Sequence, residues 1–473
     1  MKNPMPSNIV DLHATELSRA IRNKQVSCTE VMQAYLSHIN RHNPIYNALV
    51  NLVDEDQLMA QAKHADETLA QGRYWGWMHG MPHAVKELAE VAGIPFTEGS
   101  PIYQNRIGIN DDPIVAKIRQ QGAIFIGKTN TPEFGLGSQS YNPLFGVTAS
   151  AYDPELTAGG SSGGAACGLA TRMLPVADGS DMMGSLRNPG AFNNVIGFRP
   201  SANVIDLNNT GPDQPLSTKG PMGRNTRDLI QLLQTIALQP FPGVFSPVEL
   251  KTIHIGWLGD LNHYLPMDPG ILDLCEASLE SAALAGVRIH SINLPFEASD
   301  LWESWTTLRH NRRLDRKEEL FDDEAVRALL KPEMTWEFEQ ALSITPEEMA
   351  TARRIRNHWL STLERLFVSF DFLALPSAQA FPFSKAIHWP TEVGGQKMDT
   401  YHRWMEVMIP ASLGGLPVIN LPVGFDEYGR PMGLQVIGPF GGDKKVLEFA
   451  LAYEQITNHL QRRPTLVEMG SGQ

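Results

Sequence analysis

Two glycine-rich turns, each carrying a serine, are the stretches of this sequence best suited to chemistry. Gly159–Gly164 (GGSSGG) contains Ser161, and Gly179–Ser185 (GSDMMGS) ends in Ser185. Glycine lets backbone N–H groups point at a ligand, and a small hydroxyl in such a turn can be exposed as a nucleophile. A serine hydroxyl is a weak nucleophile, so it needs a base from elsewhere in the chain.

A histidine is one candidate base for Ser161. Gly159–Gly163 matches the pattern G-x-S-x-G, which exposes a nucleophilic serine between a strand and a helix. The preceding Ala151–Ala158 contains a proline and turn formers, which disfavour the required strand. A Ser–Asp–His triad is therefore the less favoured alternative. The downstream histidines, among which spacing does not choose, are His254, His263, His290 and His310.

A neutral lysine is the other candidate base. Lysine can accept a proton only where burial or a nearby positive group lowers its pKa. Lys86 and Lys128 each end an apolar stretch that predicts a strand. Either could instead be an ordinary lysine that extends to solvent. Spacing alone does not choose between the two.

The elements around the two turns should hold both serines together. Gly164–Arg172 is rich in small residues and predicts a closely packed helix start, and Leu174–Ala177 predicts a short buried strand. A loop, helix, strand and loop in this order would bring Ser161 and Ser185 to the same edge of a sheet.

Alternation of strands and helices predicts an α/β fold, with a central twisted mixed β-sheet covered by helices on both faces. The expected strands are Gly80–Val85, Ala123–Gly127, Ile196–Pro200, Thr252–Gly256, Val287–Ile292, Phe370–Pro376, Leu416–Val423 and Gly433–Gly438. The expected helices are Ala14–Asn23, Cys28–Arg41, Asp54–Gln71, Asp112–Gln121, Leu229–Leu238, Ile271–Ala285 and Leu447–His459. Val467–Gln473 is expected to be a frayed tail.

One segment differs in character from this pattern. Ser299–Phe367 is rich in charge and in tryptophan, and we interpret it as a helical excursion from the sheet. It could cap the substrate site or form a peripheral layer, and both alternatives stay open. We see no internal repeat, and we expect residues 1–473 to form a single domain that includes this excursion at 299–367.

Composition excludes several classes of function. The net charge of −13 argues against a nucleic-acid partner, because phosphate binding needs a basic surface. The three cysteines are widely spaced and indicate neither a disulfide framework nor a zinc site. The first residues carry no apolar signal region, and no apolar run approaches the ~18 residues of a membrane span. We therefore expect a cytoplasmic protein without a membrane partner.

Three stretches in a fixed order closely resemble the amidase-signature hydrolases: GMPHAVKELAEVAG, GGSSGGAA and GSDMMGSLRNPGAFNNVIGFRPS. Further motifs of the family are GKTNTPEFG, NPLFG, GPMGRNTRDL, SLGGLPVINLPVG and GLQVIGP. The resemblance covers roughly Ala14–Gln239 and Leu373–Leu451, and it implies the amidase-signature fold.

The resemblance assigns roles to the reacting residues. It implies that Ser185 is the nucleophile, Ser161 the bridging serine and Lys86 the base, which leaves Lys128 a structural lysine. It also implies a cis peptide bond between Gly160 and Ser161. The oxyanion hole would consist of the backbone N–H groups of Met182, Met183, Gly184 and Ser185.

The resemblance also implies a substrate pocket. Gly135 matches the position whose main chain meets the substrate, and Phe145 is expected to line the same pocket. Asp181 and Arg187 are expected to pair and hold the second turn. Met183 departs from the family, which usually has glycine there, and this affects the expected substrate range rather than catalysis.

The expected function is a serine amidohydrolase that cleaves C–N bonds of small or aryl carboxamides through an acyl-enzyme. Carbamates (urethanes) and esters are natural extensions. Its partner would be a small-molecule amide or carbamate, with no metal and no cofactor, and a homodimer is an open alternative. A second hypothesis is the glutaminase-type subunit of a tRNA-dependent amidotransferase. A non-enzymatic binding protein is a third, and it is disfavoured because all three reacting residues are present.

Overall fold

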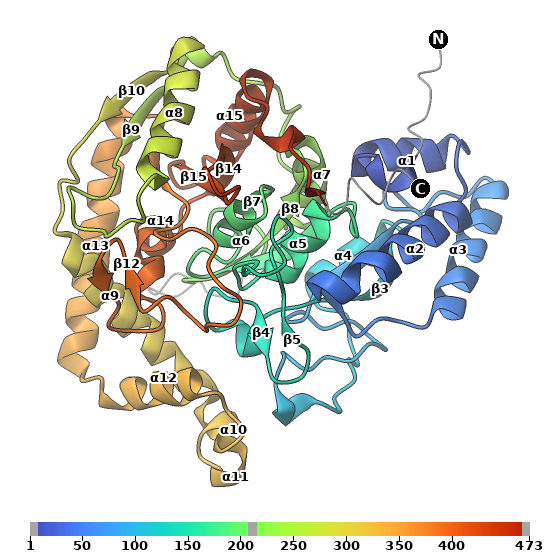
Figure 1. Ribbon diagram of the computed structural model, residues 1–473, viewed down its shortest axis with the longest axis horizontal. Coiled ribbons are helices and arrows are strands. Elements are labelled where there is room, and N and C mark those ends of the chain that lie inside the picture. Colours follow the sequence, from blue (N-terminus) through green and yellow to red (C-terminus); the bar gives the residue numbers. More distant parts are fainter. Residues whose placement is uncertain (1–7, 207–214, 466–473) are drawn as a thin grey trace.

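A large mixed β-sheet forms the centre of the computed structural model, which describes residues 8–206 and 215–465 (Figure 1). Its strand order is β10-β9-β11-β15-β14-β7-β8-β6. The pairs β10–β9 and β9–β11 are parallel, and the remaining pairs are antiparallel. The strands are β6 (Ala177–Asp181), β7 (Ile196–Arg199), β8 (Thr218–Gly223), β9 (His254–Trp257), β10 (Arg288–Ser291), β11 (Phe372–Pro376), β14 (Val418–Phe425) and β15 (Pro431–Ile437).

A second, three-stranded sheet carries the N-terminal part of the chain. Its order is β1-β3-β2, with β1 (Leu49–Val50), β2 (Pro82–Lys86) and β3 (Ile124–Thr129). β2 runs parallel to β3 and also contacts β6 of the large sheet. The contact between β2 and β6 joins the two sheets at the end of β2.

Helices flank the large sheet, as predicted for an α/β fold. α6 (Arg187–Phe192) packs on β7, β14 and β15, and α8 (Ile271–Leu284) and α15 (Asp443–Ile456) pack on β14. The N-terminal helices gather at one side of the molecule (Figure 1). The others in these regions are α1 (Ala14–Arg22), α2 (Cys28–Tyr46), α3 (Glu55–Ala70), α4 (Pro113–Gln120), α5 (Gly163–Ala170), α7 (Thr226–Ile236) and α14 (Ile409–Gly414).

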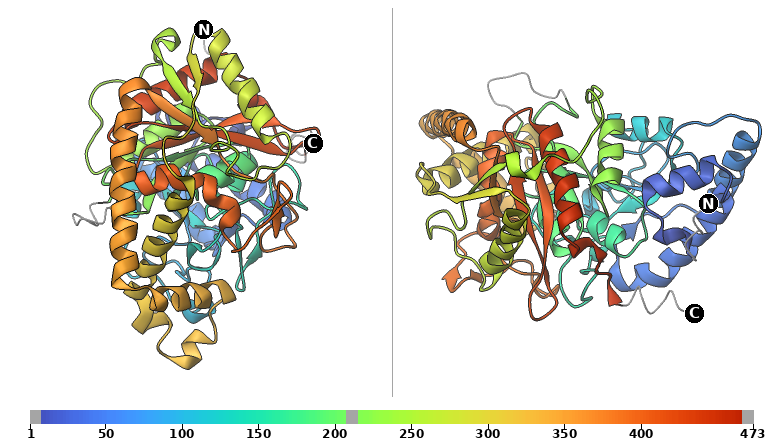
Figure 2. Two further views of the ribbon diagram at one scale, coloured as in Figure 1. Left: turned by 90° about the vertical axis from the view of Figure 1, so that its left-hand side faces the viewer. Right: turned by 90° about the horizontal axis from the view of Figure 1, so that it is seen from above.

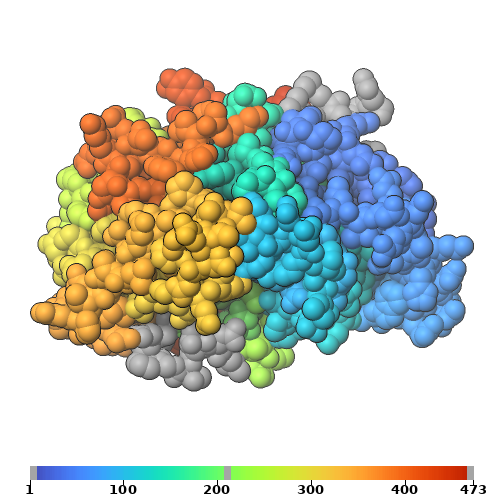
Figure 3. Space-filling model, turned by 90° about the horizontal axis from the view of Figure 1, so that it is seen from below, coloured from blue at the N-terminus to red at the C-terminus, as the bar shows by residue number. Residues whose placement is uncertain are grey.

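The segment 298–369 is helical. It comprises α9 (Ala298–Asn311), α10 (Lys317–Leu320), α11 (Glu324–Arg327), α12 (Pro332–Ser343) and α13 (Pro346–Ser369). α13 runs along one edge of the molecule and packs against α9 and α14 (Figure 2). A separate apolar cluster joins the tip of this segment to two loops: Leu136, Leu320, Phe321, Leu330, Met334, Phe338 and Tyr401. On the surface the segment directly adjoins the N-terminal part of the chain (Figure 3).

Side-chain caps explain where the longest helices begin. The Thr345 hydroxyl accepts the N–H of Glu348, and the Glu348 carboxylate accepts the N–H of Thr345, with Pro346 in the first turn. Ser27 caps α2 in the same way, as its sequence suggests. α2 extends beyond the predicted end at residue 41 to Tyr46, although Pro44 in its last turn cannot donate a hydrogen bond to the Asn40 carbonyl, and it ends at Asn47 in the left-handed conformation.

Near the serine turns one predicted strand was wrong in its position and one strand was not predicted. The apolar residues Leu174–Val176 form a buried turn, in which the Leu174 N–H bonds to Gly168, and the strand β6 begins only at Ala177. β8 was not predicted, because its proline and glycines are typical of turns. A side chain at Gly220 would meet the Phe198 carbonyl oxygen at 2.3 Å, so the close approach of strands requires glycine there.

Two other expectations concern the ends of the chain and membranes. The tail expected at Val467–Gln473 lies outside the described residues. Within residues 8–206 and 215–465, no helix combines the length and apolar character needed to cross a bilayer.

Candidate active site

Lys86, the last residue of β2, lies at the centre of a cluster of serines. Its side chain is buried, and Nζ donates hydrogen bonds to Ser161 Oγ (2.8 Å), Ser162 Oγ (2.8 Å) and Ser180 Oγ (3.0 Å). Ser161 and Ser162 come from the first glycine turn, and Ser180 from β6. Two separate segments therefore converge on the amine at the end of β2.

The surroundings of Lys86 favour a neutral amine. Burial lowers the pKa of Lys86 to about 7, against the opposing effect of the Asp178 and Asp181 carboxylates. An ammonium group has three donors and no acceptor, and here each donor meets one hydroxyl. Once Nζ is neutral, its lone pair can accept a proton from one of these hydroxyls, as a base requires.

Asp178 holds the backbone of β2 in place at Lys86. One carboxylate oxygen accepts the N–H of Lys86 (3.2 Å), and the other lies 3.0 Å from His83 Nε2. All three groups are buried. This carboxylate ties β2 to β6, and sequence reasoning missed it together with His83 and Ser180.

The two serine turns are joined by a backbone hydrogen bond. The Ser162 N–H donates to the carbonyl oxygen of Ser185 at 3.2 Å. The peptide bond between Gly160 and Ser161 is cis, as the family resemblance implied. Ser185 is 8% exposed and, like Ser161, lines a cavity. The structure therefore brings the expected nucleophile, bridging serine and base to one place.

Asp181 holds the second turn through a dense set of hydrogen bonds. Its carboxylate accepts from Arg187 Nη2 (2.9 Å) and Arg199 Nη1 (3.2 Å), which confirms the expected pairing with Arg187. Burial alone would raise the pKa of Asp181, but the Arg187 and Arg199 guanidiniums hold it well below its ordinary value. The carboxylate stays charged and the turn keeps its shape.

The same carboxylate changes the expected oxyanion hole. The Gly184 N–H donates to Asp181 Oδ1 at 3.0 Å. It is therefore not free to stabilise an oxyanion, contrary to its expected role. Among the described residues, no main-chain acceptor takes the N–H groups of Met182, Met183 and Ser185. Three of the four expected N–H groups are therefore free for a developing oxyanion in this structure.

The cavity beside the serines has a volume of about 470 Å³. Gly135 lines it as expected, and a Cβ placed on Gly135 would lie 3.6 Å from Ser161 Oγ. Phe145 does not line it, so that prediction was wrong: the Phe145 carbonyl accepts from Asn47 Nδ2 in another part of the chain. Phe134 lines the cavity instead, with Leu88, Ser138, Met182, Met183 and Met405 among others.

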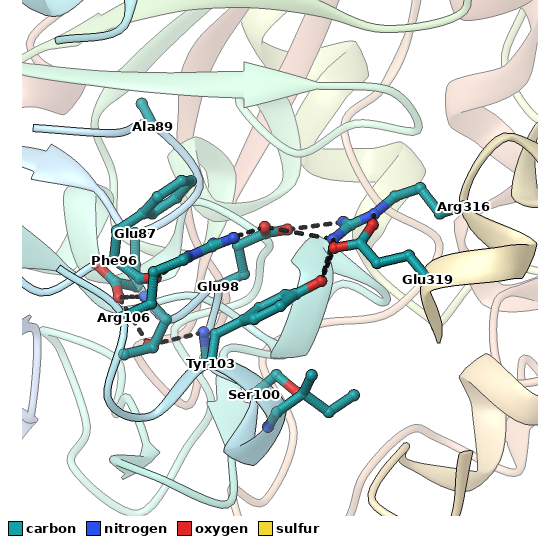
Figure 4. Close-up of polar contacts among 12 residues, drawn as sticks. Glu87, Ala89, Phe96, Glu98, Ser100, Tyr103, Arg106, Arg316 and Glu319 are labelled. Carbon is teal, nitrogen blue, oxygen red and sulfur yellow. Dashed lines mark hydrogen bonds and ion pairs between the residues drawn. The ribbon is translucent and has the colours of Figure 1, made fainter. Parts of the chain in front are cut away.

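The helical segment 298–369 contributes part of the cavity wall, through Arg309, Arg312, Arg313, Asp315 and Arg316. Arg316 also bonds to Glu98 and Glu319, and the ring of Tyr103 lies beside it (Figure 4). Glu98 belongs to the loop that follows Lys86 along the chain. Ion pairs thus connect the helical segment to the loop that leads away from the base.

The alternative bases lie in different surroundings. Lys128 is buried, lies 3.5 Å from the Glu87 carboxylate and donates to the Ala89 carbonyl oxygen. His263 is almost fully exposed on the surface. The hydrogen bond to Ser161 Oγ comes from Lys86, and residues 151–158 form turns and isolated bridges rather than a strand. Both observations disfavour the histidine triad.

One group of metal-ligand types occurs within residues 8–206 and 215–465. His310, Glu337 and His402 are buried, with their ligand atoms within 4.8 Å of one another. The Glu337 carboxylate already accepts from Arg309 (2.8 Å) and Arg313 (3.1 Å). Two adjacent guanidiniums oppose a cation, so these residues do not fit a metal ion.

Curated relatives match nearly the whole chain. Among curated relatives, a glutamyl-tRNA(Gln) amidotransferase subunit from Thermosynechococcus vestitus is 28% identical over 95% of this chain and 99% of the relative. A glutamyl-tRNA(Gln) amidotransferase subunit from Clostridium acetobutylicum is 26% identical over 94% of this chain and 99% of its own length.

Solved structures share the fold. A bacterial aryl acylamidase of the amidase-signature enzymes matches with a TM-score of 0.86 and 22% identity, over 98% of this chain and 99% of that one. The crystal structure of an amidase matches with a TM-score of 0.82 and 26% identity, over 94% and 100%. A family model described as Amidase matches residues 30–447. Because that match spans most of its length, the chain belongs to the amidase family of amidase-signature enzymes.

Proposed function

We propose that the protein is a serine amidohydrolase that cleaves the C–N bond of small or aryl carboxamides. The observation that carries this proposal is the hydrogen bond from a buried, low-pKa Lys86 to Ser161, in a cavity that Ser185 also lines. A lysine near neutrality, a hydroxyl relay and an accessible serine together match the needs of acyl transfer.

In the proposed mechanism, Ser185 Oγ attacks the substrate carbonyl while its proton passes to Ser161 Oγ. Ser161 gives its own proton to neutral Lys86. The N–H groups of Met182, Met183 and Ser185 stabilise the oxyanion, and each such donor is worth roughly 3 kcal/mol. The proton then returns from Lys86 through Ser161 to the leaving nitrogen. Water releases the acyl group by the same route.

Carbamates and esters are proposed as further substrates. Both present an acyl carbonyl to the same nucleophile, and an ester needs less help at the leaving atom. Met182 and Met183 line the cavity with flexible, polarisable side chains that suit an aryl group. Urethane cleavage is therefore part of the proposal.

The second candidate is the glutaminase-type subunit of a tRNA-dependent amidotransferase. The curated relatives named above favour it, since they carry that name at up to 28% identity. Such a subunit would need partner proteins, whereas the first candidate would act alone on simple amides. We also propose a cytoplasmic protein with a small-molecule substrate, and light scattering would decide whether it forms a homodimer.

The test is hydrolysis of p-nitroacetanilide by the isolated chain, beside a p-nitrophenyl carbamate and an ester. Ser185→Ala should abolish amide turnover. Ser377→Ala, which alters a buried serine outside the cavity lining, is the matched control and should retain it. Turnover of the ester alone, or full amide turnover by Ser185→Ala, would overturn the proposal. Release of ammonia from glutamine only with partner proteins would favour the second candidate.

A further inference from the structure

Arginines line the catalytic cavity on the side formed by α9 and the turn after it. Arg309, Arg312, Arg313 and Arg316 all contribute to the wall of the cavity that Ser185 lines. The chain as a whole is acidic, with a net charge of −13. A cationic wall at this place therefore differs from the general charge of the protein.

Arg309 presents a donor without a strong acceptor. Its side chain is 4% exposed; Nε donates to Glu337 (2.8 Å), and Nη2 donates to the Tyr401 hydroxyl (2.6 Å). Nη1 meets only the thioether of Met182, at 3.9 Å. A thioether is a weak acceptor, so the N–H groups of Nη1 are left for a ligand.

Arg313 shares the carboxylate that neutralises Arg309. Its Nε donates to the other oxygen of Glu337 at 3.1 Å. The neighbouring groups do not supply a second negative charge. Burial raises the pKa of Tyr401 well above its usual value, and burial lowers the pKa of His310 and His402. Two guanidiniums facing one carboxylate leave one positive charge in excess.

Three further charged side chains of the wall are compensated or screened: Arg316, Lys219 and Asp315. Arg316 lies between Glu98 and Glu319 (Figure 4). Lys219 bonds to Asp112 at 2.8 Å and lies 3.5 Å from Asp206, which also lines the cavity. Asp315 is exposed, so water screens its charge. Arg309 and Arg313 differ from these groups because two guanidiniums share the single Glu337 carboxylate.

We propose that Arg309 and Arg313 form a subsite for a carboxylate group on the substrate. The planar fork of a guanidinium matches a carboxylate in shape and charge. Met182, which Arg309 contacts, belongs to the turn that carries Ser185. The carboxylate of the substrate thus lies a few atoms from the scissile carbonyl. Half-amides of short dicarboxylic acids and carboxylated anilides are the substrate class, and this inference rests on the proposed amidase function.

The experiment compares matched pairs of anilides that differ in one carboxylate. Succinanilate and 4-methylpentananilide differ on the acyl side, and 4-acetamidobenzoate and 4-isopropylacetanilide differ on the leaving side. In one pair or both, kcat/KM for the carboxylate should exceed that for the neutral member by about tenfold or more. Arg313→Met, which restores a one-to-one pair of Arg309 with Glu337, should remove this preference.

Two variants separate charge from folding. Arg313→Lys keeps the charge and should keep most of the preference. Lys219→Met removes a cavity-lining cation of nearly equal exposure, 22% against 20% for Arg313, and should leave the preference unchanged because that cation is already paired. Equal rates within both pairs, or a preference that survives Arg313→Met, would overturn the subsite.

Binding to Ser185→Ala protein, measured by calorimetry, separates this inference from the proposed function. Tighter binding of the carboxylate member without hydrolysis of any anilide by the wild type would support the subsite and overturn the amidase function. Ser185-dependent hydrolysis of the neutral anilides with no preference for the carboxylates would support the amidase function and overturn the subsite.

Discussion

Lys86 is the last residue of β2, and Lys128 is the last but one of its parallel neighbour β3. Both amines are buried, yet the groups around them differ in chemistry. Nζ of Lys86 meets three hydroxyls, whereas Nζ of Lys128 lies 3.5 Å from the Glu87 carboxylate. Burial lowers the pKa of both lysines, and at Lys128 the Glu87 charge opposes it. The two lysines therefore differ in the groups that their amines contact directly.

This comparison separates a base from a structural cation by what the amine touches. A directly paired carboxylate favours the ammonium form, while a hydroxyl can accept from the ammonium and donate to the amine. Lys86 can therefore change protonation state without breaking its hydrogen-bonded contacts. Lys128 cannot lose its proton without leaving a buried carboxylate unpaired.

The largest expected effect follows removal of the base. Lys86→Met should lower kcat on p-nitroacetanilide by about 10²–10⁴-fold, because it removes the amine that is hydrogen-bonded to Ser161 Oγ and takes its proton. Initial rates and circular dichroism of the purified variant measure activity and folding. A folded Lys86→Met protein with wild-type turnover would contradict the assignment of this lysine as base.

Removal of the other lysine should act on stability. Lys128→Met leaves the buried Glu87 carboxylate without its cation, at a cost of about 3–5 kcal/mol in the free energy of unfolding. The double variant Lys128→Met/Glu87→Gln should recover part of that loss, as a double-mutant cycle in urea would show. A double variant no more stable than Lys128→Met would mean that the two charges are not coupled.

The local sequence pattern could not distinguish the base from the structural lysine. Each directly follows an apolar stretch that was predicted correctly as a strand, so local pattern treats them alike. Their partners Ser180 and Glu87 come from different parts of the chain and are assembled only by the fold. The family resemblance assigned Lys86 because it compares whole motifs rather than local periodicity.

Strands were predictable where their side chains fill the apolar core. β3 (Ile124–Thr129) and β14 (Val418–Phe425) follow this rule. β6 consists of Ala-Asp-Gly-Ser-Asp, whose buried polar side chains serve the site, so it lacks the apolar signal of a strand. Asp178 was not predicted as a site residue for the same reason, because it lies in this strand. Phe145 was misplaced because an aromatic residue near a site motif does not reveal which way its loop turns.

The acid limb of the pH profile offers a smaller, sharper test. With the pKa of Lys86 near 7, Nζ is mostly protonated below that pH and mostly neutral above it. Since the base must be neutral, kcat/KM on an uncharged amide should fall by about tenfold per pH unit below 7 and level off above it.

The protonation of Lys86 also makes the free energy of unfolding depend on pH. Between about pH 7 and the ordinary lysine pKa of roughly 10.4, unfolded Lys86 binds a proton that the folded side chain does not. The free energy of unfolding should therefore rise with pH across this range, and Lys86→Met should weaken the rise. A wild-type profile flat between pH 5 and 9 would show that Lys86 does not titrate there.

Ser180→Ala should give the smallest effect, a shift of the acid limb to lower pH. Ser180 Oγ accepts a hydrogen bond from the Lys86 ammonium at 3.0 Å and so favours the charged form. Losing one such bond, worth about 1 kcal/mol, should lower the pKa of Lys86 by roughly 0.7 unit. Ser377→Ala, a buried serine outside this cluster, should leave the limb in place. A shift toward higher pH would mean that Ser180 stabilises the neutral amine, and that the three hydroxyls differ in role rather than sharing the ammonium equally.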